Sequence, residues 1–182
     1  MVLQKVNKTA LNAVFCFYKS NLWYYIIMKE GIIVSIYIAS DHRGVALKEY
    51  LVQELSKESN VIKSKIENSS EDDYPDFAFD VCMHMSKERD LGILICGNGI
   101  GIAIAANKVN GIRCGRVTSI DDAKASKEHN HANVISLPAS MDHSLALEIC
   151  KAFINSVPSD EDRHVRRVNK ITLYENGEYN AI

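Results

Sequence analysis

Apolar and polar positions from Ile32 onward follow two alternating patterns. Runs such as IIVSIYIA (32–39) and LGILIC (91–96) are almost wholly apolar and rich in β-branched residues, which is typical of strands buried on both faces. Between such runs, apolar residues recur at spacings of three and four, as they do on one face of a helix. The pattern predicts strands at 32–39, 61–66, 91–96, 111–117 and 133–138, and helices at 43–59, within 69–88, and at 100–109, 119–130, 140–157 and 159–174.

Strands separated by helices of this length are joined by right-handed crossovers, which make the strands parallel and place helices on both faces of the sheet. The sequence therefore predicts the α/β class: a three-layer Rossmann-like domain with a five-stranded parallel sheet and a C-terminal helix. Pro75 suits the first turn of one helix, and Ser119 suits the start of another. Met83 and Met85 are expected to fill the core.

The first 30 residues follow neither pattern. They are aromatic-rich without a clear period, Lys19 interrupts the apolar run, and no small-residue cleavage site of a secretory signal follows. We expect residues 1–30 to be an N-terminal extension, either non-native or disordered, and residues 31–182 to form the domain, whose native start lies near Met28.

Composition narrows the function classes of this chain. It is 47% hydrophobic and 24% charged with a formal net charge of −2, so we expect neither nucleic acid nor a membrane surface as a partner. Its five cysteines include no C-x-x-C pair, which favours reduced thiols and a cytoplasmic location over a disulfide framework.

Ligands of parallel α/β sheets bind outside the carboxyl ends of the strands. We expect three loops with candidate chemistry at that edge: ASDHRG after the first strand, CGNGIG after the third, and EHNHAN before the fifth. The glycine loop, Gly97–Gly101, reads G-x-G-x-G. A dinucleotide fingerprint would be G-x-G-x-x-G after the first strand, so nucleotide binding stays an alternative, as does a merely structural turn.

The glycine loop also suits an anion. Small residues let its N–H groups face one point at a helix N-terminus, where they can hold a phosphate or a developing oxyanion. Cys96 stands at the end of the preceding strand, where a positive environment would favour its thiolate and let it act as a base. Cys82, Cys114 and Cys150 are expected to be inert small hydrophobic residues.

Six motifs in order, SDHRG, DDYPD, ICGNGIGIAIAANK, GIR, EHNHANV and RHVRRV, resemble the type B ribose-5-phosphate isomerases. This family also includes galactose-6-phosphate and allose-6-phosphate isomerases, and the resemblance extends over about residues 32–174. It implies a metal-independent aldose–ketose isomerisation without a cofactor. It also implies a homodimer, or a dimer of such dimers, in which two subunits share each active site around a phosphorylated sugar.

The resemblance assigns roles to residues of two kinds. The catalytic residues that it implies are Cys96 as the base, His129 and Asp41 in ring opening, and Asn98 in the glycine loop. The substrate-binding residues that it implies are His42, Tyr74, Gly97, Gly99, Ile100, Gly101, Asn130, Arg163 and Arg167, of which the two arginines would bind the phosphate from one helix face.

The chain departs from the family pattern at two positions. Asn98 replaces the usual Thr or Ser, so a hydroxyl role in proton relay passes to an amide or lapses. Ser140 stands where the family has an arginine, so one phosphate-facing charge is missing. Some members use a glutamate as base where this chain has Ile102, which puts the chain in the cysteine branch. His129 and His131 could suggest a metal, but no third ligand has a convincing spacing, so none is expected. A hexose-6-phosphate isomerase and a non-catalytic sugar-phosphate or nucleotide-binding protein remain alternatives.

Overall fold

The computed structural model describes residues 34–180, so the expectations for residues 1–30 lie outside the described part. Residues 34–180 form a five-stranded parallel sheet in the order β2-β1-β3-β5-β4. The central strand β3 is buried at every residue, as its unbroken apolar sequence predicts. The strands are β1 (Ser35–Ser40), β2 (Asn60–Lys63), β3 (Leu91–Cys96), β4 (Cys114–Arg116) and β5 (Val134–Pro138).

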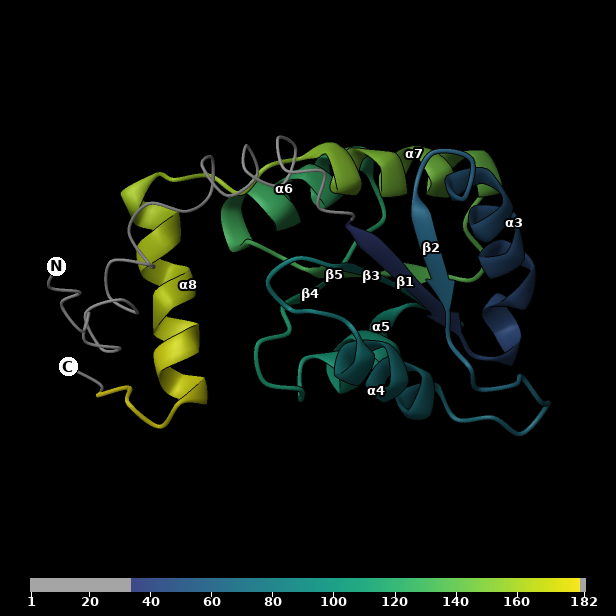
Figure 1. Ribbon diagram of the computed structural model, residues 1–182, viewed down its shortest axis with the longest axis horizontal. Coiled ribbons are helices and arrows are strands. Elements are labelled where there is room, and N and C mark those ends of the chain that lie inside the picture. The colour runs from purple at the N-terminus through teal and green to yellow at the C-terminus, as the bar shows by residue number, and fades with distance from the viewer. Residues whose placement is uncertain (1–33, 181–182) are drawn as a thin grey trace, which may run out of the picture.

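Helices cover both faces of this sheet, which confirms the predicted three-layer α/β fold (Figure 1). One face carries α3 (Val45–Leu55), α6 (Ile120–Asn130) and α7 (His143–Asn155), whereas the other carries α4 (Tyr74–His84) and α5 (Ile100–Ala106). A short 3-10 turn, η1 (His42–Gly44), links β1 to α3. The last helix, α8 (Asp162–Glu175), lies beyond the sheet at the end of α6 and buries only His164 and Val168.

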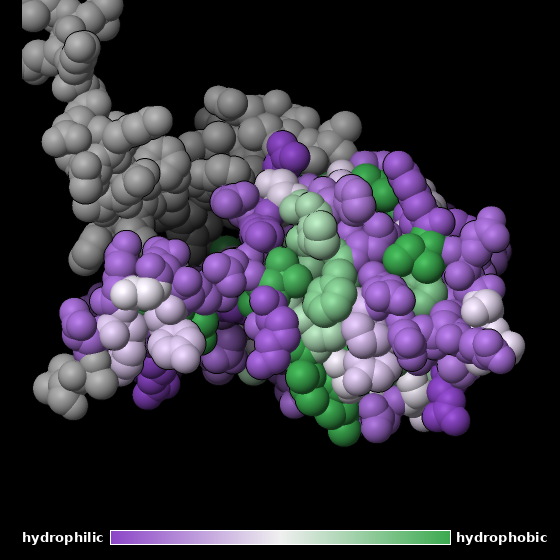
Figure 2. Space-filling model, turned by 90° about the horizontal axis from the view of Figure 1, so that it is seen from below, coloured by the Kyte–Doolittle hydropathy of each residue, from purple (hydrophilic) through white to green (hydrophobic). Residues whose placement is uncertain are grey.

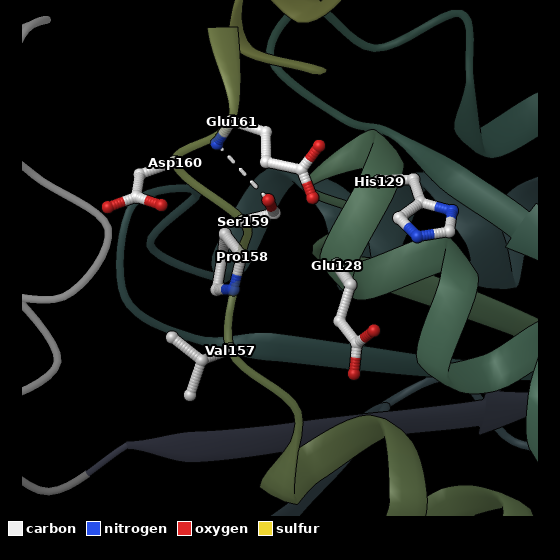
Figure 3. A pocket seen from close by; sticks show the side chains of 7 residues that line it. All are labelled: Glu128, His129, Val157, Pro158, Ser159, Asp160 and Glu161. Atoms are coloured by element: carbon white, nitrogen blue, oxygen red, sulfur yellow. Dashed lines mark hydrogen bonds between the residues drawn. The ribbon is translucent and has the colours of Figure 1, made fainter. Parts of the chain in front are cut away.

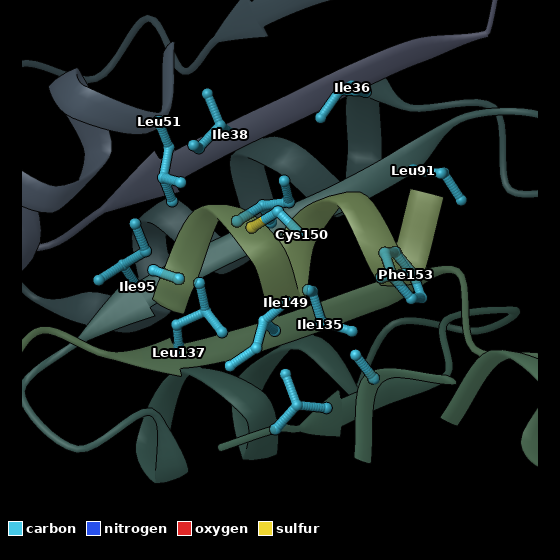
Figure 4. Packing of buried hydrophobic residues seen from close by; sticks show 14 of the residues in the cluster. Ile36, Ile38, Leu51, Leu91, Ile95, Ile135, Leu137, Ile149, Cys150 and Phe153 are labelled. Atoms are coloured by element: carbon cyan, nitrogen blue, oxygen red, sulfur yellow. The ribbon is translucent and has the colours of Figure 1, made fainter. Parts of the chain in front are cut away.

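Each face of the sheet has its own apolar core. Side chains of α3 and α7 interleave with those of β1, β3 and β5, as Figure 4 shows around Cys150 and Phe153. Phe77 and Ile102 anchor the opposite core, which also contains Cys96. Because both faces are filled by the chain's own helices, the carboxyl edge of the sheet is the place where loops can form a site.

The local signals that start helices are confirmed. Pro75 lies in the first turn of α4, and the Ser119 hydroxyl accepts the N–H of Asp122 at the start of α6. The strands β2 and β4 are shorter than predicted, since β2 pairs with β1 only over Asn60–Lys63 and β4 pairs with β5 only over Cys114–Arg116. The prediction for Met83 is wrong, since its side chain is 73% exposed, whereas Met85 is buried. No helix among residues 34–180 is long and apolar enough to cross a membrane.

Candidate active site

The carboxyl ends of β1 and β3 bring the first predicted residues together. Ser40 pairs with Ile95 in the register of these strands, so Asp41 and Cys96 follow directly beside each other. The N–H of Asp41 donates to the carbonyl of Ile95 at 3.1 Å, which ties the start of the ASDHRG loop to β3. Cys96 is only 4% exposed, and its carbonyl accepts the N–H of Ala139.

The side chain of Asp41 has a structural task in addition to any chemistry. Its Oδ1 accepts the N–H groups of Arg43 (3.0 Å) and Gly44 (3.3 Å) and so caps η1. Gly44 is required here because a Cβ would stand 2.5 Å from Cγ2 of Ile95. The first loop is therefore fixed against the end of β3.

The glycine loop turns sharply from β3 into α5. Gly99 has a φ of 74°, which favours glycine, and its carbonyl accepts the hydroxyl of Ser136 at 2.8 Å. Within the loop, Oδ1 of Asn98 accepts the N–H of Ile100 at 3.0 Å. Asn98 thus stabilises the turn itself, and in this structure the N–H of Ile100 is used inside the loop.

Tyr74 packs against this loop from the start of α4. A Cβ at Gly101 would lie 2.6 Å from Cζ of the Tyr74 ring, so the absence of a side chain at Gly101 allows the ring to approach. The tyrosine is 40% exposed. The predicted substrate-binding residues Tyr74 and Gly97–Gly101 therefore lie on the same edge as Cys96.

The glycine loop is flanked by two arginines, Arg43 and Arg116, which were not among the predicted site residues. The Arg43 guanidinium lies against Gly97, where an added Cβ would be 2.9 Å from Nη1. On the other side, Nε of Arg116 donates to the carbonyl of Asn98 at 2.8 Å. Their positions in the sequence could have indicated a place in the site, because Arg43 comes shortly after β1 and Arg116 ends β4, both at the carboxyl edge of the sheet.

Three further cysteines of residues 34–180, namely Cys82, Cys114 and Cys150, lie away from the carboxyl end of β3 that holds Cys96. Burial raises the pKa of the Cys82 and Cys150 thiols to about 12 and also raises that of Cys114. These thiols stay protonated near neutral pH, in keeping with their interpretation as packing residues.

His42 follows Asp41 in the first loop, whereas His129 and Asn130 lie at the opposite edge of the sheet, so the expectation for EHNHAN is wrong. A crossover helix starts at the carboxyl edge and returns to the amino edge, and His129 and Asn130 are the last two residues of α6. The 11 residues of α6, at 1.5 Å each, separate its two ends by about 16 Å. Within one chain, His129 and Cys96 therefore do not form one site.

Helix α8 joins His129 at this second edge. The rings of His129 and His164 stack with centroids 4.4 Å apart and an interplanar angle of 4°. Burial lowers the pKa of His164, and the charges of His129 and Arg163 add to the effect. Arg163 and Arg167 share one face of α8, where Nε of Arg163 contacts Oε2 of Glu161 at 2.8 Å.

A pocket of about 250 Å³ opens beside His129, between the end of α6 and the connection from α7 to α8 (Figure 3). The lining residues are Glu128, His129, Val157, Pro158, Ser159, Asp160 and Glu161. The N–H of Ser159 donates to the carbonyl of Glu128, which holds the connection against α6. Neither Cys96 nor the glycine loop reaches this pocket. Within residues 34–180, no three His, Cys, Asp or Glu side chains gather as metal ligands would.

The motifs on both edges agree with a known family. A family model described as Ribose/Galactose Isomerase matches residues 36–171. The chain belongs to this family. The matched range contains the predicted residues at the Cys96 edge and those at the His129 edge, which lie at opposite edges of the sheet within one chain.

Solved structures of ribose-5-phosphate isomerases B are similar in fold to most of this chain. Ribose-5-phosphate isomerase B of Mycoplasma genitalium, crystallised with bound ribulose 5-phosphate, is 39% identical with a TM-score of 0.74, covering 79% of this chain and 97% of that one. The enzyme of Clostridium thermocellum gives the same identity and TM-score over 80% of this chain and all of that one. The ribose-5-phosphate isomerase B of Mycolicibacterium paratuberculosis is 34% identical over 145 residues, which is 77% of this chain and 91% of that protein.

Proposed function

We propose that this protein is an aldose–ketose isomerase that interconverts ribose 5-phosphate and ribulose 5-phosphate in the pentose phosphate pathway. The observation that carries the proposal is the bound ribulose 5-phosphate of the Mycoplasma genitalium relative, which shares both the fold and 39% of its sequence with this chain. The thiol and glycine loop at the end of β3 are consistent with this chemistry. We further infer a cytoplasmic enzyme that needs no cofactor, because the proton moves between adjacent carbons of one substrate.

The proposed reaction uses Cys96 as the base. After His129 and Asp41 assist opening of the sugar ring, the Cys96 thiolate takes the proton from C2 of the open-chain aldose. The electrons of that C–H bond form a C1–C2 double bond, and the carbonyl electrons move onto the C1 oxygen. The hydroxyl proton of C2 then passes to the C1 oxygen, the electrons that it leaves form the C2 carbonyl, and C1 takes the proton back from the Cys96 thiol, which gives the ketose. Amides of the glycine loop stabilise the negative oxygen of the enediolate, and Arg43 and Arg116 add positive charge beside them.

The proposal includes a homodimer in which each site takes residues from two subunits. Cys96, Asp41, His42 and Tyr74 would come from one subunit, and the His129, Asn130, Arg163 and Arg167 group from the other. The position of these groups at opposite edges of the sheet in one chain supports this arrangement. A second copy would bring the amino edge of one sheet to the carboxyl edge of the other.

Exposed apolar surface supports the same dimer. Figure 2 shows apolar side chains gathered over the face of α4 and α5. Met83 on α4 is 73% exposed, and Ile104 and Ile100 on α5 are 57% and 47% exposed. On α8, Ile171 and Tyr174 are exposed at 46% and 75%. Burial of such side chains in a dimer removes apolar area from water at about 25 cal/mol per Å².

A rate assay with ribose 5-phosphate on matched cysteine variants tests the function. Cys96→Ala and Cys96→Ser should abolish turnover while sugar-phosphate binding, measured by calorimetry, stays largely intact. Cys114→Ala is the matched control, since Cys114 also lies in a strand of this sheet, and it should keep its activity. Full activity in both Cys96 variants would refute the base assignment. Turnover of galactose 6-phosphate or allose 6-phosphate in place of ribose 5-phosphate would point to the hexose-6-phosphate branch of the family.

A further inference from the structure

His42 rests on a carboxylate that comes from a different loop. Nδ1 of its ring lies 2.7 Å from Oδ1 of Asp72, and the same oxygen accepts the backbone N–H of His42 at 2.9 Å. Asp72 belongs to the connection between β2 and α4, thirty residues further along the chain. Its side chain is 7% exposed, whereas that of His42 is 40% exposed. The carboxylate is therefore inside the loop and the imidazole faces the outside.

Both oxygens of the Asp72 carboxylate have partners. Oδ1 accepts the backbone N–H of His42 and lies 2.7 Å from its Nδ1, and Oδ2 accepts Nδ2 of Asn68 at 2.9 Å and the N–H of Ser69 at 3.2 Å. An ionised carboxylate accepts on both oxygens and requires the ring nitrogen that faces it to donate, whereas an amide would present its NH₂ group to one pair of donors. Burial alone would raise the pKa of Asp72, but the bonds from Asn68, His42 and Ser69 outweigh it and lower the pKa to about 2.

A buried lysine extends this arrangement into the core. Nζ of Lys48, a residue only 9% exposed, donates to Oδ1 of Asn68 at 2.7 Å. The amide of Asn68 also donates to the carbonyl of Ser40 at the end of β1. The carboxylate of Asp72 is thus fixed relative to the strand that precedes Asp41 and His42. A loop that only closed a turn would not need a buried cation and an amide behind one surface histidine.

We propose that Asp72 is a positioning residue of the candidate active site, which holds His42 with Nδ1 inward and presents Nε2 to the substrate. The nitrogen that a histidine offers to a ligand is set by the hydrogen bond that its other nitrogen makes. With Nδ1 held by Asp72, Nε2 accepts from a sugar hydroxyl in the neutral ring and donates to a phosphate oxygen in the charged ring. This inference rests on the proposed function, because it takes the substrate of His42 from that proposal.

The first test measures the imidazole directly and requires no activity. Nitrogen-15 NMR of the neutral His42 imidazole in the wild-type protein should show its proton on Nδ1. In Asp72→Ala the population with the proton on Nδ1 should fall. If the wild-type ring carries its proton on Nε2, the proposal is overturned, whatever the variants do.

The second test separates positioning from simple stabilisation of the loop. Asp72→Ala should raise KM for ribose 5-phosphate about tenfold, the effect of losing one charge-assisted hydrogen bond, and change kcat less than about threefold. Asp72→Asn, which keeps the shape of the side chain, should raise KM in the same direction and serves if the alanine variant does not fold. In a His42→Gln background, Asp72→Ala should raise KM no further, because the group that it positions is gone.

Asp80→Ala is the matched control. Asp80 also contacts a histidine, His84 on α4, with Oδ1 3.2 Å from Nδ1, but this pair lies within a single helix and outside the candidate site. It should keep the wild-type KM. An unchanged KM in Asp72→Ala, or an equal rise in Asp80→Ala, would overturn the positioning role. A wild-type protein without isomerase activity would instead count against the proposed function, while the NMR result on His42 would still be readable.

Discussion

Two inactive variants should restore each other's activity if the active site is shared between subunits. Cys96 and His129 lie at opposite edges of the sheet, so each proposed site takes one of these residues from each subunit. In a dimer of one Cys96→Ala chain and one His129→Ala chain, one site carries both substitutions. The other site carries neither.

The expected recovery is about a quarter of the wild-type activity. Equal amounts of the two variants, unfolded and refolded together, assort at random, so half of the dimers are mixed. Each mixed dimer has one intact site of two, which gives about one half of one half. The assay is the rate with ribose 5-phosphate before and after joint refolding, with each variant refolded alone as the blank.

The matched control pairs two residues on the same edge. Asp41 and Cys96 follow paired strand ends in one chain, so a mixture of Asp41→Ala with Cys96→Ala leaves every site with one defect and should recover no activity. The reasoning is refuted if the Cys96→Ala and His129→Ala mixture stays inactive although both chains refold and form mixed dimers. Equal recovery in both mixtures would also contradict the assignment of residues to edges.

Three further changes have defined expected results. Arg167→Ala should mainly raise KM with a small change in kcat, as removal of a phosphate contact does; an unchanged KM would argue against phosphate binding there. Gly101→Ala places a Cβ 2.6 Å from Cζ of Tyr74, so the ring must move and substrate affinity should fall in a titration; an unchanged affinity would argue against a substrate contact of Tyr74. The pKa of Asp72 is lowered from 3.8 to about 2, so the ionised carboxylate stabilises the fold fully above about pH 4 and loses this effect as pH falls toward 2. The contribution is of the order of 1 kcal/mol after solvent screening. In acid unfolding experiments, Asp72→Asn should therefore lose less stability than the wild type between pH 4 and pH 2.

The sequence pattern was sufficient for the sheet and its helices, because burial on two faces leaves a strong periodic signal. The same signal was ambiguous on α4, where Met83 looks like a core residue but is exposed in the single chain. An apolar residue in the pattern indicates that its side chain is shielded from water, but not whether its own chain or another copy shields it. This is why a pattern that predicted β3 correctly failed at Met83.

The candidate site was predictable to the extent that it follows strand ends. Cys96 and Asp41 come directly after strands, so parallel pairing places them together. The EHNHAN loop lies at the opposite edge because α6, which leads into it, starts at the carboxyl edge and runs back to the amino edge. The role of Asp72 within DDYPD could not be predicted, since its contact with His42 depends on how a loop of ten residues folds back, and no local pattern encodes that path.

The two outer strands of the sheet are also its shortest. β2 has four residues and β4 has three, and the exposed Lys63 and Arg116 stand at their ends. Short edge strands with charged residues offer a neighbouring molecule few backbone N–H and C=O groups for strand pairing. Growth of this protein into strand-by-strand fibres is thereby discouraged, and any self-association is left to the surfaces of its helices, where a closed pair can satisfy both partners.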